Sequence, residues 1–350
     1  MNRLTIHFTI LAIAMIVLGQ NAQAQIASPR LNPMETLRAN PFFHPTSDVV
    51  LFDSSSPFNP AVDIWRDASH LGVGVGNHDS SASVSGPQGN FDVATGDSQT
   101  VQLALVGEMF AFSARVANHD MEIDPGLGTG TFTIDTAHVG LSAKLGEILS
   151  LGVGFQSEEN HDETQGPGNE ITLKEEMPLG GVTLRLGEMF FVGGAYGTET
   201  VDAESPQGPA SGDRAVTNIG VGIQTRDGDT GFHIEIYKST EDLLELFEPG
   251  GNEVYSSEGE KTGATLEVVF SNILLGVESL KSTSEVNNPF PPPGVPVLRT
   301  GESKETMLSV GWIPQEGLSL VVSATENELT EYNGDVVTYE SGAATLFWRF

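Results

Sequence analysis

The chain has 350 residues and a formal net charge of −31, because 47 aspartates and glutamates outnumber 16 lysines and arginines. This acidity argues against nucleic acid as a partner and against binding to anionic lipid through a basic patch. The sequence contains no cysteine, which excludes disulfides and metal sites built on thiolates.

Residues 1–24 have the pattern of a secretory signal peptide. Arg3 supplies the basic start, the apolar run "FTILAIAMIVLG" follows, and "AQA" ends at Ala24 with the small side chains of a cleavage site. We therefore expect an exported mature chain that begins near Gln25. No later stretch reaches the roughly 18 consecutive apolar residues of a membrane helix, so insertion in a membrane would require a closed β-barrel.

Residues 25–67 contain prolines and no sustained alternation of apolar and polar side chains, which makes them poor material for a membrane strand. They nevertheless carry many apolar side chains, which favours packing against the rest of the protein over exposure to water. These side chains are Phe42, Phe43, Val49, Val50, Leu51, Phe52, Phe58 and Trp65.

Residues 68–350 divide into segments of alternating hydrophobicity bounded by turn residues, the pattern of antiparallel membrane strands. Fourteen such segments are predicted: 70–84, 99–106, 109–120, 131–145, 148–157, 169–186, 189–201, 214–225, 230–239, 260–270, 273–285, 303–313, 318–330 and 336–350. Six short turns alternate with seven longer connections, as expected for a barrel with both termini on the periplasmic side. A soluble sandwich or propeller also has short strands, but it would not require this alternation.

The last strand, "AATLFWRF", places Leu346, Trp348 and Phe350 on one face. In an exported chain, this ending resembles the terminal strand of bacterial outer-membrane barrels. The resemblance implies recognition by the outer-membrane assembly machinery, contact with outer-membrane lipid and lipopolysaccharide, and residence in the outer membrane of a Gram-negative cell.

The segment "DSSSPFNPA", residues 53–61, resembles the motif that precedes the barrel in the long-chain fatty-acid channel family (FadL type). The triplet of that motif corresponds here to Asn59, Pro60 and Ala61. The resemblance implies a fourteen-stranded barrel whose N-terminal segment folds inward as a hatch. The glycine-rich opening that often precedes the motif is absent from this chain, which leaves the identity of the ligand open.

Assigning the more apolar face of each strand to lipid leaves a polar face for the lumen. The lipid-facing set includes Val101, Leu105, Phe110, Leu151, Val153, Ile219, Ile236, Leu318 and Leu320. The candidate lumen-lining residues are Arg115, Arg185, His233, Glu235, Glu267 and Glu278.

Pro178 interrupts a predicted strand and is followed by Gly180 and Gly181. Proline cannot donate a ladder hydrogen bond, so these residues are candidates for a kink in the barrel wall. In the FadL-type family a strand kink opens a lateral route into the membrane; a simple turn or a shifted strand boundary is the alternative reading.

The stretch "STEDLLELFEPGG" has a serine or threonine cap, acidic residues in its first turn and a Pro-Gly stop, which predicts a short helix in a loop from Thr240 to Glu258. Its apolar side chains are candidates for surface capture of a hydrophobic ligand, with packing against another loop as the alternative. They are Leu243, Leu244, Leu246 and Phe247.

An enzyme is not expected, because the chain has no nucleophile elbow and its scattered histidines have no HExxH-type spacing. No cofactor or metal site is predicted either. The sequence therefore predicts an all-β transmembrane antiparallel barrel of about fourteen strands, with residues 1–24 as signal peptide, 25–67 as hatch and 68–350 as barrel. Its expected function is uptake of hydrophobic small molecules such as fatty acids or hydrocarbons. The alternatives are a diffusive cation-preferring porin and a closed structural barrel.

Overall fold

The computed structural model describes most of the chain beyond residue 58. The described ranges are 59–65, 69–83, 90–123, 130–163, 170–187, 189–206, 208–227, 230–247, 249, 251, 253–287, 298–312, 317–330 and 336–349. The expected signal peptide, residues 1–24, lies outside these ranges, as do residues 25–58 of the expected hatch and the terminal Phe350.

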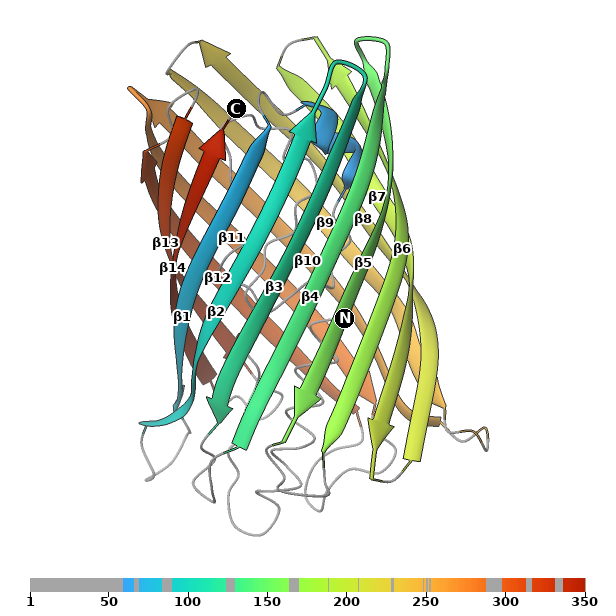
Figure 1. Ribbon diagram of the computed structural model, residues 1–350. Helices are drawn as coiled ribbons and strands as arrows, with labels where there is room; N and C mark the ends of the chain where they lie inside the picture. Colours follow the sequence, from blue (N-terminus) through green and yellow to red (C-terminus); the bar gives the residue numbers. More distant parts are fainter. Residues whose placement is uncertain are drawn as a thin grey trace.

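Fourteen β-strands account for nearly all of the described residues (Figure 1). They are β1 His70–Ser83, β2 Asn90–Val106, β3 Phe110–Ile123, β4 Gly130–Leu145, β5 Leu149–Asp162, β6 Ile171–Leu186, β7 Phe190–Ser205, β8 Gly208–Asp227, β9 Thr230–Phe247, β10 Glu253–Phe270, β11 Ile273–Asn287, β12 Leu298–Trp312, β13 Gly317–Thr330 and β14 Val336–Arg349. Every strand pairs antiparallel with its neighbours in the sequence. The fourteen antiparallel strands expected from the sequence are thus confirmed.

The first and last strands also pair with each other, which closes the sheet into a barrel. Their register runs from His70 opposite Arg349 to Ser83 opposite Val336. A closed sheet leaves no edge strand, so every strand can satisfy its backbone hydrogen bonds on both sides. The remaining element in the part of the chain that the structure describes is a 3-10 helix, η2 Pro60–Trp65. Among the described residues, no helix is long and apolar enough to cross a membrane.

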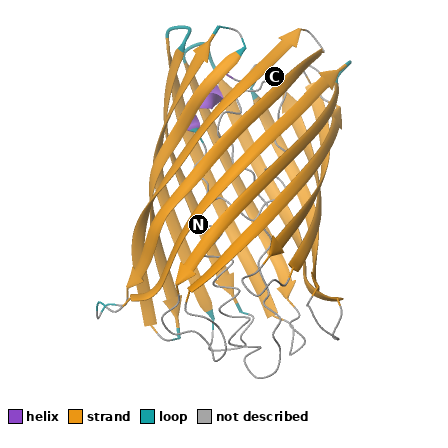
Figure 2. Cartoon of the chain, turned by 180° about the vertical axis from the view of Figure 1, so that it is seen from behind, coloured by secondary structure: helices purple, strands orange, loops and turns teal. Residues whose placement is uncertain are grey.

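One end of the barrel carries the short turns, and we call the other the loop end (Figure 2). One of these short turns joins β10 to β11 through Ser271 and Asn272, whose φ angles are 49° and 65°. Two consecutive residues with positive φ form a type I′ hairpin turn, and its twist matches that of the flanking strands. Gly146 and Gly187 occupy similar positive-φ positions in the turns after β4 and β6, with φ of 76° and 72°.

Two long loops expected at the loop end are shorter than predicted. The expected loop 202–213 is mostly strand, because β7 ends at Ser205 and β8 begins at Gly208. The expected loop from Thr240 to Glu258 is also mostly strand. The backbone ladder continues past the apolar part of these strands into polar sequence, where alternating hydrophobicity no longer marks a strand. The prediction therefore ended the strands too early.

The two faces of the wall differ as the sequence predicted. Apolar side chains project from the outer face, where Val153 is 62% exposed and Ile219 58% exposed. The polar side chains of alternate positions are buried on the inner face, including Gln156, Asn218 and His233. An exposed apolar belt on a closed barrel is typical of a surface that contacts lipid.

Candidate functional site

The segment from Asn59 to Trp65 lies against the inner face of the wall and contacts strands β2 to β6. Figure 2 shows η2, in purple, near the short-turn end of the barrel. Ala61 and Asn59 are fully buried, and Ile64 is 2% exposed. A segment that precedes the first strand is therefore part of the protein's interior.

Asn59 fixes the start of this segment to β6. Its side-chain amide donates hydrogen bonds to the carbonyl of Val182 at 3.2 Å and to the hydroxyl of Thr183 at 3.1 Å. Its side-chain oxygen accepts a hydrogen bond from the backbone N–H of Ala61 at 3.1 Å. One side chain thus orders the turn into η2 and attaches it to the wall.

Two glycines of the wall make room for this attachment. A Cβ atom at Gly152 of β5 would lie 2.5 Å from the backbone nitrogen of Ala61, and a Cβ at Gly181 of β6 would overlap the side-chain oxygen of Asn59. Any larger residue at these two positions would collide with the segment, because real Cβ atoms do not approach other atoms so closely. We call the surface formed by Ser150, Gly152, Gly181 and Thr183 the glycine seat.

Trp65 fixes the other end of the segment. Its indole N–H donates to the hydroxyl of Ser150 at 2.7 Å, and that hydroxyl donates to the carbonyl of Ala61 at 2.6 Å. The ammonium of Lys144 lies 4.3 Å from the centroid of the indole ring, and the guanidinium carbon of Arg185 lies 5.3 Å from it. The ring therefore makes hydrogen-bond and cation–π contacts together.

A small apolar core surrounds this end of the segment. Ile64 and Trp65 pack with Ala111 of β3 and Phe191 of β7, and Val106 packs against the group. The guanidinium of Arg185 also lies over the ring of Phe191, 5.6 Å from its centroid. The short-turn end of the lumen thus holds η2 by apolar packing as well as by polar contacts.

The predicted triplet Asn59, Pro60 and Ala61 lies at the centre of this site. Of the wall residues that receive it, Gly181 was predicted only as part of a kink, and the others were not predicted as a site. Ser150, Gly152 and Thr183 come from two strands, and only their register places them side by side: Gly152 lies opposite Gly181, and Ser150 lies opposite Thr183. A serine or glycine in an alternating strand carries no sign of what it touches. The sequence signal for this receiving surface was the frequent glycine on the predicted lumen face.

The six candidate lumen residues all lie on strands, and four of them are almost fully buried on the inner face. His233 lies 3.2 Å from Glu235, measured between Nε2 and Oε2. Glu278 accepts a hydrogen bond from the hydroxyl of Tyr237 at 2.6 Å, and Glu267 is 7% exposed. Arg115 and Arg185 are half-buried, and Arg185 belongs to the Trp65 site. His233 and Glu235 thus contact each other, whereas Glu278 and Arg185 contact aromatic side chains of the interior.

The predicted helix with a ligand-capture surface is wrong. Residues 239–247 belong to strand β9, so their side chains alternate between the two faces. Leu244 and Leu246 are buried, whereas Leu243 is 50% exposed and Phe247 is 40% exposed. The four residues therefore do not form one surface, and they do not lie in a loop.

The proposed kink residues lie inside β6. The β6–β7 pairing passes from Glu176 opposite Thr200 to Leu179 opposite Gly197, so Met177 and Pro178 stay outside that ladder without a change of register. Pro178 still lies opposite Phe155 of β5. The proline thus interrupts one ladder locally, as its missing N–H requires, and the alternative of a turn or strand boundary is wrong.

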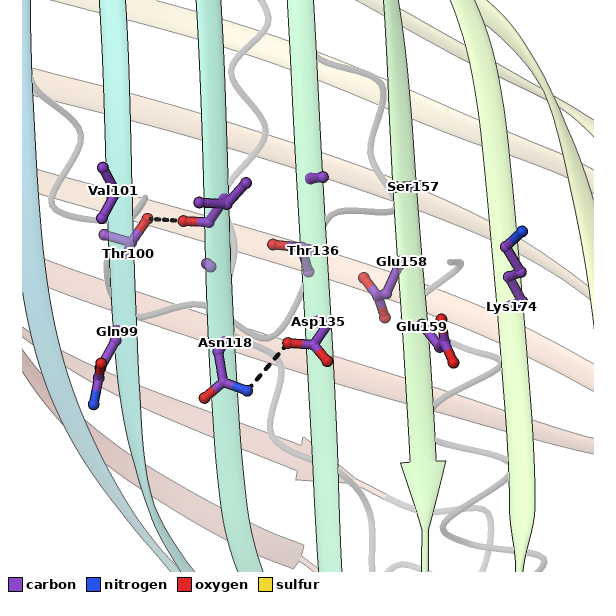
Figure 3. A pocket seen from close by; sticks show the side chains of 13 residues that line it. Gln99, Thr100, Val101, Asn118, Asp135, Thr136, Ser157, Glu158, Glu159 and Lys174 are labelled. Carbon is purple, nitrogen blue, oxygen red and sulfur yellow. Dashed lines mark hydrogen bonds between the residues drawn. The ribbon is translucent and has the colours of Figure 1, made fainter.

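A groove of about 500 Å³ crosses strands β2 to β6 away from the glycine seat (Figure 3). Exposed side chains such as Gln99, Val101 and Lys174 border it, so it opens to the outside of the barrel. Its floor includes a cross-strand hydrogen bond from the amide of Asn118 to Asp135 at 3.1 Å. It shares no residue with the buried segment, and we do not assign it to the candidate site.

Comparison with solved structures supports the fold. A Pseudomonas aeruginosa FadL homologue matches with a TM-score of 0.52 and 11% identity, over 92% of this chain and 99% of that chain. The P. putida toluene transporter TodX matches with a TM-score of 0.51 and 11% identity, over 92% of this chain and 99% of that chain. This chain has their fold. The resemblance to FadL-type channels stated from residues 53–61 is confirmed at that level.

Comparisons of the whole sequence find no relative. No protein-family model matches the chain, and a search of curated proteins finds no match. At 11% identity the similarity establishes the arrangement of strands and nothing about ligand. The site must therefore be argued from its own contacts.

Removing the indole of Trp65 should release η2. We expect Trp65→Ala to increase the labelling rate of an introduced Ile64→Cys by roughly 100-fold or more, because truncating a buried tryptophan costs about 3–5 kcal/mol and each 1.4 kcal/mol is tenfold. Maleimide labelling of the folded barrel measures this rate, since the native chain has no cysteine. Trp312→Ala is the control because Trp312 is 53% exposed on the outer face, and labelling should not change. Equal rates in the two variants would show that Trp65 does not hold the segment.

Proposed function

We propose that this protein is an outer-membrane channel for the uptake of hydrophobic small molecules, and that its N-terminal segment is a hatch. The observation that carries the proposal is the burial of Asn59, Pro60, Ala61, Ile64 and Trp65 on the inner wall. A segment docked inside a barrel through two glycines and a few polar contacts can close the lumen and still be displaced. The fold of the FadL homologue and the toluene transporter supports the same function.

The location rests on independent features. An exposed apolar belt suits a barrel in lipid, residues 1–24 have the pattern of an export signal, and the terminal strand suits recognition by the assembly machinery. Lipopolysaccharide and outer-membrane lipid are then the expected surroundings. The substrate class is hydrophobic, and both fatty acids and hydrocarbons fit it.

The inner wall contains an apolar patch suited to such a ligand. Met177, Leu179 and Val216 form a buried cluster on the inner face of β6 and β8. The cluster lies beside the interruption of the β6–β7 ladder at Pro178, where proline cannot donate a ladder hydrogen bond. In the proposed mechanism the ligand enters the lumen from the loop end, contacts this cluster and leaves when the hatch shifts or the wall opens at Pro178.

Single-channel conductance in planar bilayers tests the hatch. The full mature chain should be nearly silent, and a chain that lacks residues 25–61 should conduct steadily, because removing Asn59 empties the glycine seat. Direct binding of a radiolabelled fatty acid and of toluene to the purified full chain then tests the substrate class. Silence from both chains would favour a closed structural barrel.

A diffusive, cation-preferring porin is the second candidate, and the charge of the inner wall favours it. The buried carboxylates of the described residues outnumber the buried lysine and arginine, Lys261 and Arg214. These carboxylates are Glu158, Asp162, Glu175, Glu199, Glu235, Glu241, Glu267, Glu278 and Glu305. Steady cation-selective conductance from the intact chain would establish this function and contradict the hatch.

A further inference from the structure

The wall has its largest irregularity between β8 and β9, near the loop end. The pairing jumps from Ser211 opposite Phe247 to Val216 opposite Glu241, with a change of register. We call the unpaired stretch between these points the seam; it consists of residues 212–215 on β8 and 242–246 on β9. Among the described strands, this is the longest gap in the pairing of two neighbours.

A bulge in β9 accompanies the seam. On the other side of β9, the pairing with β10 jumps from Ser257 opposite Leu244 to Gly259 opposite Glu241. A bulge bends its strand and turns its side chains. As a result Asp242 and Leu243 are both exposed, although they are consecutive.

A groove of about 680 Å³ on the outer face reaches the pair that bounds the seam at the loop end. Ser211 and Phe247, the pair at the end of the seam, both line this groove. Asp202 and Glu245 are exposed at the same level, so the groove lies in the polar zone between the apolar belt and the loop end. A molecule in the groove would thus be outside the barrel and above the lipid core.

The inner side of the seam is apolar. Leu244 is fully buried and Leu246 is 5% exposed. The Leu246 side chain lies against Gly212, since a Cβ there would be 3.3 Å from its Cδ2. Val216, at the end of the seam, is part of the cluster with Met177 and Leu179. Between these leucines and the inner patch lie two buried charges, Arg214 of β8 and Glu241 of β9, the latter opposite Val216.

Two buried ion pairs flank the seam. Arg214 of β8 pairs with Glu199 of β7, and Lys261 of β10 pairs with Glu241 of β9 at 2.5 Å. The side chains of all four residues are at most 1% exposed. Across the seam itself, the guanidinium of Arg214 and the carboxylate of Glu241 are 4.0 Å apart. The short ion pairs thus join β8 to β7 and β9 to β10, whereas the 4.0 Å contact joins β8 to β9 across the seam.

This arrangement lets the seam separate without breaking a short ion pair. If β8 and β9 move apart, Arg214 stays with Glu199 and Lys261 stays with Glu241, so each half keeps a neutral pair. Isolating a buried charge is expensive, whereas separating two neutral pairs avoids that cost. The Arg214–Glu241 contact then acts as a latch of modest strength.

We propose that the seam is a side entrance that admits a hydrophobic small molecule from the outer groove to the inner apolar patch, and that Arg214 and Glu241 latch it. The opening is inferred from the strand pairing and the ion pairs of the wall. The hydrophobic nature of the cargo rests on the function proposed above. The entrance differs from the Pro178 interruption, because it lies between other strands and faces the polar zone.

Cysteine labelling tests the latch without reference to transport. The full chain carries Leu246→Cys as its only thiol, and a membrane-impermeant maleimide is added to the barrel in lipid vesicles. Glu241→Gln weakens the latch, so we expect labelling at least about 10-fold faster than in the chain with Glu241. Glu260→Gln is the matched control because Glu260 forms an exposed ion pair with Lys238 at 2.7 Å, and the labelling rate should not change. Equal rates in all three chains would overturn the latch.

A reversible disulfide tests the entrance. Ser211→Cys with Phe247→Cys places two thiols across the end of the seam, and Glu258→Cys with Glu285→Cys places two on opposed exposed positions of the regular β10–β11 ladder. Oxidation of the seam pair should slow association of the hydrophobic fluorophore N-phenyl-1-naphthylamine at least about 10-fold, with recovery after reduction. The β10–β11 pair should have no effect.

The outcomes separate this proposal from the function on which it rests. Unchanged association after oxidation of the seam pair would overturn the side entrance and leave hydrophobic uptake intact. Failure of the fluorophore to bind any variant would count against hydrophobic uptake, and the labelling rates would then decide whether the seam opens. Retention of the folded gel mobility before heating confirms that each variant has formed its barrel.

Discussion

A Gly181→Val chain is expected to conduct ions steadily in a planar bilayer, whereas a Gly180→Val chain should behave as the unaltered protein. A Cβ at Gly181 would overlap the side-chain oxygen of Asn59 and lie 3.0 Å from Cδ of Pro60. A Cβ at Gly180 would meet only the carbonyl oxygen of Gly152, at 3.9 Å. The substitutions are adjacent and chemically identical, so they disturb β6 to a similar degree. They differ in whether the new side chain enters the glycine seat.

The expected change is large because the collision involves the fully buried side chain of Asn59 and the ring of Pro60. Overpacking of this kind typically costs about 1–3 kcal/mol, enough to displace a seven-residue segment held mainly by a few contacts. Conductance from both variants would indicate a general leak through β6. A different result would be that both variants are silent although the labelling of Ile64→Cys shows that η2 is displaced. That result would mean that residues 59–65 do not close the lumen.

The strands were predictable where they cross the apolar belt. There the two faces meet different surroundings, and Leu149, Leu151 and Val153 alternate with Ser150 and Gly152 as the period of two requires. Beyond the belt both faces are polar, and the periodicity vanishes although the ladder continues. The loop-end boundaries of β7, β8 and β10 were missed for this reason.

The helix predicted at residues 239–247 shows how a bulge can imitate a different period. The extra residue at Asp242 and Leu243 shifts the alternation by one position, so apolar side chains appear at 243, 244, 246 and 247. Such spacing fits one side of a helix as well as a bulged strand. The pairing that decides between them lies on β10, which is distant from any local sequence window.

The candidate site was predictable only in part. The triplet at Asn59 was recognisable as a motif, and the motif implied an inward fold. Its receiving surface depends on the register between β5 and β6, which sets Ser150 beside Thr183. The Trp65 contacts depend on Lys144, Arg185 and Phe191, which come from three different strands. Residues joined only by tertiary structure leave no trace in a single sequence.

Replacing Arg214 by methionine is expected to destabilise the barrel by about 3–5 kcal/mol, the usual cost of breaking a buried ion pair from one side. The Arg214 and Glu199 side chains are fully buried, so removing the guanidinium leaves the carboxylate of Glu199 in a poorly solvated place. Urea unfolding in detergent micelles, followed by tryptophan fluorescence and by gel mobility, measures the change.

The double variant Glu199→Gln with Arg214→Met is the decisive companion, because it also removes the charge of the buried Glu199 carboxylate. We expect it to recover most of the loss, since a buried pair often contributes little once both of its charges are gone. Glu241 keeps Lys261 at 2.5 Å in both variants, so the half of the network beyond the seam should stay intact. If the double variant were as unstable as Arg214→Met, the Arg214–Glu199 pair would contribute to stability by packing rather than by charge. The two ion pairs, Arg214–Glu199 and Lys261–Glu241, would then not be independent neutral pairs.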